Sequence, residues 1–479
     1  MPDILSEIQK PKGRVFRKLF VKRRLTTTGL FETDWQEVTE DVKRWGRISK
    51  SIDNVRYSRV RFSDASILVA NDYGRYNPED DEASLWWGYL SQQRTLVKIE
   101  AGFLHQTLSS SGIYTNVYLP SVPSVFVGVL QGDITLSDTN DVLLPVKPLL
   151  QVFRDFSCRN LTGLTTTGMT AAQFIGVLRD QTDGAGSFIF RPFFGNTTSY
   201  WDYTSSSIIY KDLNTEVASA QPAATPVQND FLEMNVWDAI ERLAEAENAI
   251  PYITREGQFQ FRDREVNTST VAFAFYGRGF QDRRYGQTIK KVQGYKNKLS
   301  DFYSRVEVKW NDLATTTAVV ATQTAMLVSQ NNLAWAYGHR TFSIENPWLA
   351  TVTSARTLAN NVFEAVSQVN RELTFNTSFV PHLEVLDMVS MNYQSIEAVP
   401  EMLWDVGDWA ADDTSLSTDL IWSPGEALSF VNDEFKLTAI DIDLDSFECS
   451  FIAIKTPGYG RNVGGNTVGS AIVGDAVLG

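Results

Sequence analysis

The chain has 479 residues, enough for about three domains at roughly 100–200 residues each. Its composition, 43% hydrophobic, 12% aromatic and 21% charged, is that of a globular protein and excludes wholesale disorder. No stretch approaches the ~18 consecutive apolar residues of a transmembrane helix, and the N-terminus lacks the pattern of a signal peptide. Two distant cysteines form no disulfide framework or metal-binding spacing, which suits a reducing cytoplasm, and three histidines leave few general bases or zinc ligands.

The N-terminus is basic although the net charge of the chain is −14. Its first 24 residues contain eight Lys and Arg, among them Lys18, Lys22, Arg23 and Arg24, against Asp3 and Glu7. Two interpretations remain open: a solvated arm over 1–14 followed by a strand with outward basic residues, or a segment that docks on an acidic neighbouring subunit. The acidic remainder disfavours nucleic acid as a partner.

Residues 15–155 are predicted to form strands of an antiparallel barrel or sandwich. RVFRKLFVKRRL, WQEVTEDVKRWGRIS, VRYSRVRFS and TLVKIEAGFL alternate apolar with polar residues, and SVFVGVLQGDITL continues the pattern. The Asn-, Asp-, Gly- and Pro-containing segment NDYGRYNPEDD is typical of a loop between two strands.

Residues 156–265 are predicted to form a mixed α+β domain. MTAAQFIGVLRDQT indicates a helix that Thr170 could cap. The apolar spacing of Val236, Ile240 and Leu243 predicts an amphipathic helix over 236–249, with Asn235 and Asp238 as a capping pair and Pro251 as its end. A hairpin over 251–264, turning at Glu256-Gly257, is expected next.

Residues 266–395 are predicted to form a second β-barrel that includes a helix over 354–370. VAFAFYG, IKKVQGYKN, DFYSRVEVKW and TAVVATQTAML are strand-like, and LTFNTSFVPHLEVLDMVSMNY predicts two more strands around a turn. Residues 396–456 combine an acidic, Trp-rich loop with a C-terminal hairpin, and 457–479 are a Gly/Val/Ala-rich tail that cannot pack a core alone.

Two acidic clusters are candidates for chemistry. Asp441, Asp443 and Asp445 imitate the start of a calcium loop, but Ser446 and Ile452 replace its Gly and Glu, and the alternation with Ile440, Ile442 and Leu444 favours a two-faced strand. The second cluster spans Asp405–Asp419 among Trp404, Trp409 and Trp422. It suits either a glycan site with paired carboxylates or an exposed loop that contacts another subunit.

Motifs for nucleophilic catalysis and phosphate binding are absent from the sequence. There is no Gly-x-Ser-x-Gly elbow and no Gly-rich phosphate loop, and the contexts of His105, His339 and His382 favour structural roles. The sequence therefore predicts no enzyme, no cofactor and no metal.

The order of these segments resembles the central hub proteins of phage tail tips and baseplates. The similarity lies in the strand-rich run FETDWQEV…NPEDD with TLVKIEAGFL and VFVGVLQGDI, in the helix and hairpin of VWDAIERLAEAENAIPYITREGQFQFRDRE, and in RVEVKWND with ELTFNTSFVPHLEVLDMVSMNY. It covers about residues 15–395 and transfers no active site. It implies an α+β, mainly antiparallel β fold, with two tail-tube-like β-barrels, an intervening α/β domain and a small C-terminal β region.

The resemblance also implies a role in assembly. A homotrimer with two barrels per chain would match a hexameric tail tube. It would contact the tail tube or distal tail protein, the tape-measure protein and the distal tip or fibres, in a virion assembled in the host cytoplasm. Lys18, Lys22, Arg23, Arg24, Trp404, Trp409 and Trp422 are the expected interface residues. The alternatives are a glycan-binding or glycan-hydrolysing module and the adaptor of a contractile secretion apparatus.

Overall fold

The computed structural model describes most of the chain but not all of it. The described residues are 14–24, 30–52, 60–76, 95–108, 114–121, 123–132, 134–136, 141–160, 169–182, 189–194, 234–246, 249–263, 271–277, 288–311, 316–321, 338–346, 348–349, 351–367, 370–394 and 429–455. They form a mainly antiparallel α+β fold, as predicted.

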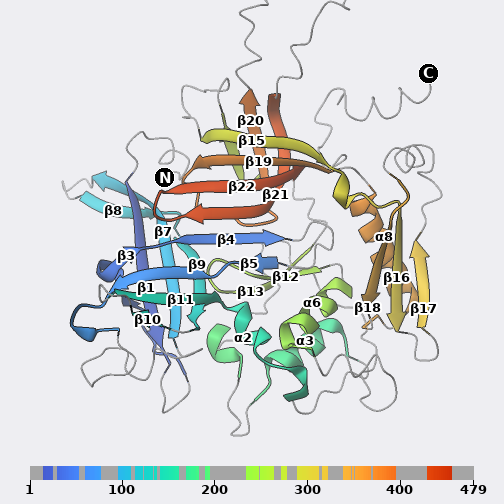
Figure 1. Cartoon of the computed structure of the whole chain (residues 1–479), viewed down its shortest axis with the longest axis horizontal. Coiled ribbons are helices and arrows are strands. Elements are labelled where there is room, and N and C mark those ends of the chain that lie inside the picture. Colours follow the sequence, from blue (N-terminus) through green and yellow to red (C-terminus); the bar gives the residue numbers. More distant parts are fainter. Residues whose placement is uncertain are drawn as a thin grey trace, which may run out of the picture.

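The first sheet is built from the N-terminal third of the chain (Figure 1). In spatial order its strands are β2 (Gln36–Glu37), β1 (Val15–Arg23), β7 (Thr95–Leu108), β9 (Ser124–Leu130), β11 (Asp141–Pro148), β6 (Ala65–Ala70) and β3 (Val42–Arg44). β8 (Tyr114–Leu119) pairs with β7, and β10 (Thr135–Leu136) pairs with β11. The strict alternation of β1 places Leu19 and Val21 in the core and its even-numbered residues on the outer face.

The second large sheet mixes segments from both ends of the chain. Its order is β14 (Phe273–Tyr276), β20 (Met388–Gln394), β21 (Ser429–Asp443), β22 (Glu448–Lys455), β19 (Asn370–Ser378) and β15 (Ile289–Lys298). β4 (Arg47–Ile52) pairs with β21 and with β5 (Val60–Phe62), so the N-terminal segment enters this sheet. The C-terminal hairpin is present as predicted, and it lies inside the second sheet rather than apart from it.

A helical layer and a small sheet complete the described structure (Figure 1). The helices are α2 (Leu150–Arg154), α3 (Ala171–Arg179), α4 (Arg191–Phe194), α6 (Val236–Ala246) and α8 (Val352–Val366). The third sheet, β17 (Thr316–Ala321), β16 (Arg305–Asn311) and β18 (Thr341–Asn346), packs on α8. The 3-10 turns are η1 (Thr39–Asp41), η2 (Asp72–Gly74), η3 (Cys158–Asn160) and η5 (Leu299–Asp301).

Local signals in the sequence explain the helix starts. Thr170 caps α3 in a capping box with Gln173, and the side chain of Asn235 accepts a hydrogen bond from the backbone N–H of Asp238 at 2.8 Å. The second amphipathic helix, predicted over 354–370, is α8, with Thr351 as its N-cap. The predicted helix 236–249 ends earlier, at Ala246.

The early end of α6 follows from strand pairing. Residues from Ala249 onward form β12 (Ala249–Ile253), which pairs with β13 (Phe259–Asp263), so Pro251 lies within a strand opposite Phe261. The hairpin predicted over 251–264 is present over 249–263, and Gly257 in its turn has φ +82°. A left-handed residue at this position favours glycine.

Two cores lie on opposite faces of the first sheet. One core joins the inner faces of both large sheets and includes Leu19, Ile99, Phe375 and Ile440. The other fills the space between the outer face of β7 and β9 and the helices α2, α3, α4 and α6, and it includes Trp237. Where the helices lie over it, the first sheet is therefore covered on both faces. Helix α6 also packs against the hairpin β12–β13.

Candidate interaction surface and the joint behind it

Lysine and aromatic side chains gather on the outer face of β1 and β7. Residues Phe20 and Lys98 are directly opposite in the pairing of these strands, as are Lys22 and Leu96. The ammonium of Lys98 lies 4.5 Å from the ring centroid of Phe20 and 5.0 Å from that of Trp35. We call this surface the lysine–aromatic face; it consists of Phe16, Lys18, Phe20, Lys22, Trp35, Lys98 and Tyr118.

The predicted basic interface residues do not all share this face. Lys18 and Lys22 belong to it, and the ammonium of Lys18 is 3.1 Å from a carboxylate oxygen of Glu37. Arg23 points to the other side of β1 and forms an ion pair with Glu32. The guanidinium of Arg24 lies 5.4 Å from the ring centroid of Phe193. Parity along β1 thus separates Arg23 from Lys18 and Lys22, whereas Arg24 follows the end of the strand.

Sequence reasoning missed five of the seven members of the lysine–aromatic face: Phe16, Phe20, Trp35, Lys98 and Tyr118. Lys98 and Trp35 lie in segments that were recognised as strand-like, but neither residue was identified as part of an interface. The signal that could have found Lys98 is the alternation of TLVKIEAGFL, in which Lys98 and Glu100 occupy the face opposite to Val97 and Ile99. Nothing in the sequence indicates that β1 and β7 are neighbours.

The predicted aromatic interface lies outside the described residues. Trp404, Trp409 and Trp422, with the whole Asp405–Asp419 cluster of the glycan interpretation, belong to the undescribed range 395–428. Residues 1–13 of the predicted arm 1–14 and the whole predicted tail 457–479 also lie outside the described residues.

The three aspartates of the calcium interpretation hold the two ends of the chain together. Asp445 accepts hydrogen bonds from the backbone N–H groups of Trp45 (3.0 Å) and Gly46 (3.1 Å). Asp443 accepts from Arg47 at 3.1 Å, and Asp441 accepts from the hydroxyl of Ser49 at 2.9 Å. The predicted two-faced strand is confirmed, because Ile440, Ile442 and Leu444 are buried. Among the described residues no group of acidic, His or Cys side chains could hold a metal ion.

A buried ion cluster joins the hairpin β12–β13 to the second sheet. Glu384 lies at its centre and receives hydrogen bonds from the guanidinium of Arg262 and the backbone N–H of Arg255, both at 2.7 Å. The ammonium of Lys50 on β4 is 3.5 Å from the same carboxylate. The Arg262 guanidinium also lies 4.2 Å from the ring centroid of Tyr252. Two cations, Lys50 on β4 and Arg262 on β13, and the backbone N–H of Arg255 thus meet one carboxylate.

Burial and charge shift the pKa values of this cluster. Burial would raise the pKa of Glu384, but Lys50, Arg262 and Arg255 outweigh it and lower the pKa. Burial lowers the pKa of Lys50, against the effect of Glu384. Burial also raises the pKa of Asp387 to about 6. These groups are therefore paired with one another, and the cluster is a structural joint.

Burial keeps both cysteines and His382 in their uncharged forms. Cys158 and Cys449 are buried, and burial raises the pKa of each thiol to about 12. Burial, with the nearby charge of Arg255, lowers the pKa of His382 to about 3. The buried, neutral imidazole of His382 fits the structural role that the sequence favours for this residue.

No protein-family model matches the chain. No curated protein matches it in sequence either.

Three solved structures of similar arrangement are named as tail proteins, two of them from prophages. A tail protein of Neisseria meningitidis is 11% identical over 92% of this chain and 96% of its own, with a TM-score of 0.45. The prophage tail protein gp18 of Listeria monocytogenes is 10% identical over 96% of this chain and 100% of its own, with a TM-score of 0.43. The 43 kDa tail protein of prophage MuSo2 of Shewanella oneidensis is 11% identical over 92% and 99%, with a TM-score of 0.44. All three TM-scores are below 0.5.

Proposed function

We propose that this chain is a structural virion protein, the trimeric hub of a phage tail tip or baseplate. The hub closes the tail tube, joins it to the distal tip or fibres and helps DNA pass into the host. The observation that carries this proposal is the pair of large, mainly antiparallel sheets. The first comes from the N-terminal part of the chain, and most strands of the second follow the α6 helix and the β12–β13 hairpin in sequence. This order matches the plan of two barrels and an intervening α/β domain that the sequence resemblance implies.

The way in which the sheets are joined supports a mechanical role. β4 from the N-terminal part pairs with β21 from the C-terminal part, and the aspartates of β21 and its turn bind the corner before β4. The buried ion cluster fastens the hairpin to the same sheet. Contacts at several distant points thus join the N-terminal and C-terminal parts of the described chain.

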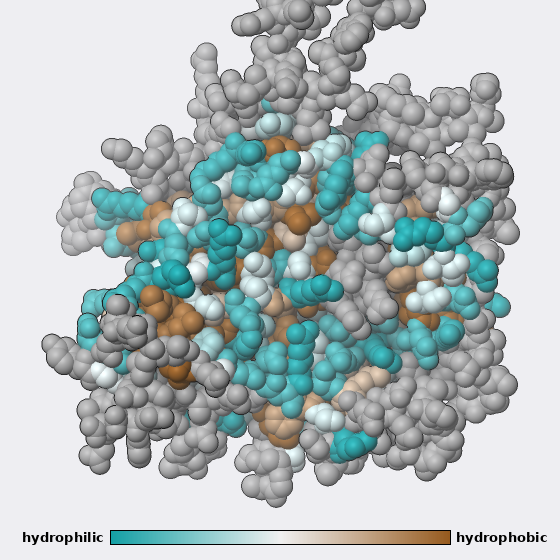
Figure 2. Space-filling view, viewed as in Figure 1, coloured by the Kyte–Doolittle hydropathy of each residue, from teal (hydrophilic) through white to brown (hydrophobic). Residues whose placement is uncertain are grey.

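The described surface is suited to polar contacts with other proteins. Figure 2 shows hydrophilic residues over most of the visible described surface, with the hydrophobic residues in separate small areas. The large hydrophobic residues that are exposed in the described part of the chain are Leu30, Tyr118, Val352 and Val431. No helix among the described residues is both long and apolar enough to cross a membrane. We assign the contact with the tail tube to the lysine–aromatic face, which includes Tyr118.

Labelling of tails tests the proposed position. Antibodies raised against the purified chain should bind at the distal end of intact tails in negative-stain electron microscopy. The purified chain, or its complex with the tube protein, should have three times the mass of one chain in light scattering. Label along the whole tube or on the capsid, or particles that lack the chain by mass spectrometry, would overturn the proposal.

A charge-reversal variant tests the assigned contact. Lys18→Glu together with Lys22→Glu should prevent co-purification with the tail-tube protein, because both residues lie on the lysine–aromatic face. The control is Lys290→Glu, which changes a lysine that is 47% exposed on β15 of the second sheet. Equal assembly of the two variants would remove the lysine–aromatic face as the contact while leaving the tail position to the labelling experiment.

A further inference from the structure

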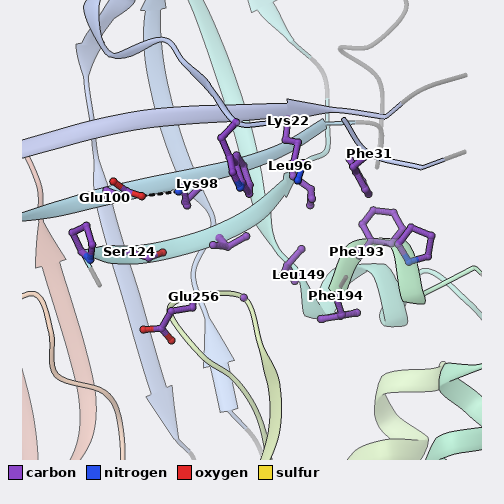
Figure 3. Close-up of a pocket in the computed structure, with 15 residues that line it drawn as sticks. Lys22, Phe31, Leu96, Lys98, Glu100, Ser124, Leu149, Phe193, Phe194 and Glu256 are labelled. Carbon is purple, nitrogen blue, oxygen red and sulfur yellow. Dashed lines mark ion pairs between the residues drawn. The ribbon is translucent and has the colours of Figure 1, made fainter. Parts of the chain in front are cut away.

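A cavity of about 340 Å³ lies between the outer face of the first sheet and the helical layer (Figure 3). β1, β7 and β9 form one wall, and α4 and the turn of the β12–β13 hairpin form the other. Its volume is near the lower end of the range of about 300–1,000 Å³ for ligand sites in proteins, which suits one or two large side chains. We call it the Lys22 pocket.

Aromatic and aliphatic side chains form most of the lining of the Lys22 pocket. Phe31 and Phe193 meet edge to face at one end, with ring centroids 5.3 Å apart (Figure 3). Trp35, Leu96 and Phe194 line it as well. An aromatic or large aliphatic group would therefore be removed from water here, and ring-to-ring contacts would add to that gain.

Four charged side chains line the pocket, and three of them have a partner of opposite charge. The ammonium of Lys98 lies 2.6 Å from a carboxylate oxygen of Glu100, and a dashed line in Figure 3 marks this ion pair. A carboxylate oxygen of Glu256 lies 2.8 Å from the guanidinium of Arg255. Lys22 differs: its ammonium lies 5.5 Å from the ring centroid of Trp35, and no carboxylate of the described chain is within 4 Å of it.

The environment of Lys22 favours an incoming anion. Burial lowers the pKa of Lys22, and the charge of Lys98 acts in the same direction, although Asp34 and Glu32 oppose it. A bound carboxylate would compensate the charge that burial has taken from water. One carboxylate suits the site better than a polyanion, because Glu100 and Glu256 also line it and the whole chain has a net charge of −14.

We propose that the Lys22 pocket binds a segment of another tail protein that presents one carboxylate beside an aromatic or large aliphatic side chain. Lys22 receives the carboxylate, and the Phe31–Phe193 end receives the apolar group. This partner rests on the proposed function, whereas the chemistry of recognition rests on the pocket alone. Binding here would connect β1, the helical layer and the hairpin through one ligand.

Binding of short peptides to the purified full-length chain tests this proposal. The probes for isothermal titration calorimetry are N-acetyl-Glu-Trp-amide, its Gln-Trp counterpart, which lacks the charge, and its Glu-Ala counterpart, which lacks the aromatic ring. The Glu-Trp peptide should bind at least tenfold more tightly than either of the others. Equal affinities, or no binding of the Glu-Trp peptide at millimolar concentration, would overturn the proposal.

Substitutions at position 22 assign the preference to the pocket. Lys22→Gln should remove the preference for Glu over Gln, whereas Lys22→Arg and the distant control Lys290→Gln should keep it, with thermal midpoints showing that all variants are folded. A preference that survives Lys22→Gln would overturn the proposal. So would binding of a thymidine dinucleotide in place of the Glu-Trp peptide, which would identify nucleic acid as the ligand. These measurements use the isolated chain, so peptide binding can fail while the labelling of tail tips succeeds. Equally, peptide binding can succeed while the labelling fails.

Discussion

At the residue scale, charged side chains in the interior lie beside side chains of opposite charge. Glu384 is 6% exposed and Arg262 is 5% exposed, and a single unpaired charge at that depth would cost several kcal/mol. Their hydrogen bond of 2.7 Å, together with Lys50, keeps each charge compensated. The motif LEVLD (383–387) was predicted to belong to a strand, but it lies in the turns before β20. Its role as an anchor for the hairpin depends on residues more than 100 positions away.

His382 and Asp387, which lie near this ion cluster in the sequence, change the stability of the folded chain with pH in opposite directions. The pKa of His382 is lowered to about 3 in the folded chain, so stability is lost as the pH falls below the unfolded value of about 6.5. The pKa of Asp387 is raised to about 6, so the folded chain gains stability as the pH falls from 6 toward the unfolded value of about 3.9. Between pH 6 and pH 4 the two effects largely cancel.

Asp387→Asn should therefore make the chain more sensitive to acid. The substitution removes the compensating gain, so the loss of stability between pH 7 and pH 5 should exceed that of the unsubstituted chain by about 1 kcal/mol, since one pKa unit corresponds to about 1.4 kcal/mol. Thermal midpoints at the two pH values measure this difference. His382→Phe should do the opposite and reduce acid sensitivity. Identical pH profiles for the three proteins would contradict the assignment of these groups.

At the element scale, the β12–β13 hairpin shows how a local turn is fixed by its surroundings. Gly257 has φ +82°, which by itself calls for glycine, and an added Cβ would lie 3.1 Å from both Leu149 and Val127. The turn is thus pressed against β9 and the start of α2, and it also lines the Lys22 pocket. The conformation can be inferred from the sequence Glu256-Gly257, whereas the close packing cannot.

Gly257→Ala should destabilise the chain more than Gly74→Ala does. Both glycines have positive φ, so each substitution costs about 1–2 kcal/mol in backbone strain, but a Cβ at Gly74 has nothing within 4 Å. The extra contacts at Gly257 should add roughly 1 kcal/mol or more by overpacking. Thermal midpoints and hydrogen exchange of residues 249–263 measure the effect. Equal effects of the two variants would mean that the turn moves freely away from the sheet.

At the scale of the whole molecule, strand pairing joins the N-terminal and C-terminal parts of the described chain. β21 pairs with β20 along its first half and with β4 along its second half, so it belongs to the N-terminal and C-terminal parts at once. The predicted boundaries at 155, 265 and 395 describe segments of the sequence, and the second sheet contains strands from both sides of each of them. One core accordingly joins the inner faces of both large sheets.

Two truncations test this closure. Deleting 429–479 removes β21 and β22 from the middle of the second sheet, so it should abolish cooperative unfolding and expose apolar surface throughout the shared core. Deleting 456–479 leaves every described strand intact and should keep the thermal midpoint within a few degrees. Circular dichroism melts and gel filtration distinguish the two. A first sheet that still melts cooperatively after the longer deletion would show that the N-terminal part folds alone.

The sequence by itself determined the elements whose cause is local. The amphipathic spacing of Val236, Ile240 and Leu243 predicted α6, Glu256-Gly257 predicted the hairpin turn, and the alternation around Asp441 and Asp443 predicted a two-faced strand. It also identified Lys18 and Lys22 as outward basic residues of a strand. These predictions succeed because helical and strand periodicity are properties of neighbouring residues.

Only the tertiary structure decided which elements meet. That β1 lies beside β7, that β4 enters the second sheet, and that Lys50, Arg262 and Glu384 share one site depend on pairings between segments far apart in the chain. Alternation shows which face of a strand is buried but does not specify its partner or register. The Lys22 pocket exists for the same reason, because its walls come from five separate elements that are brought together only when the cores on both faces of the first sheet form.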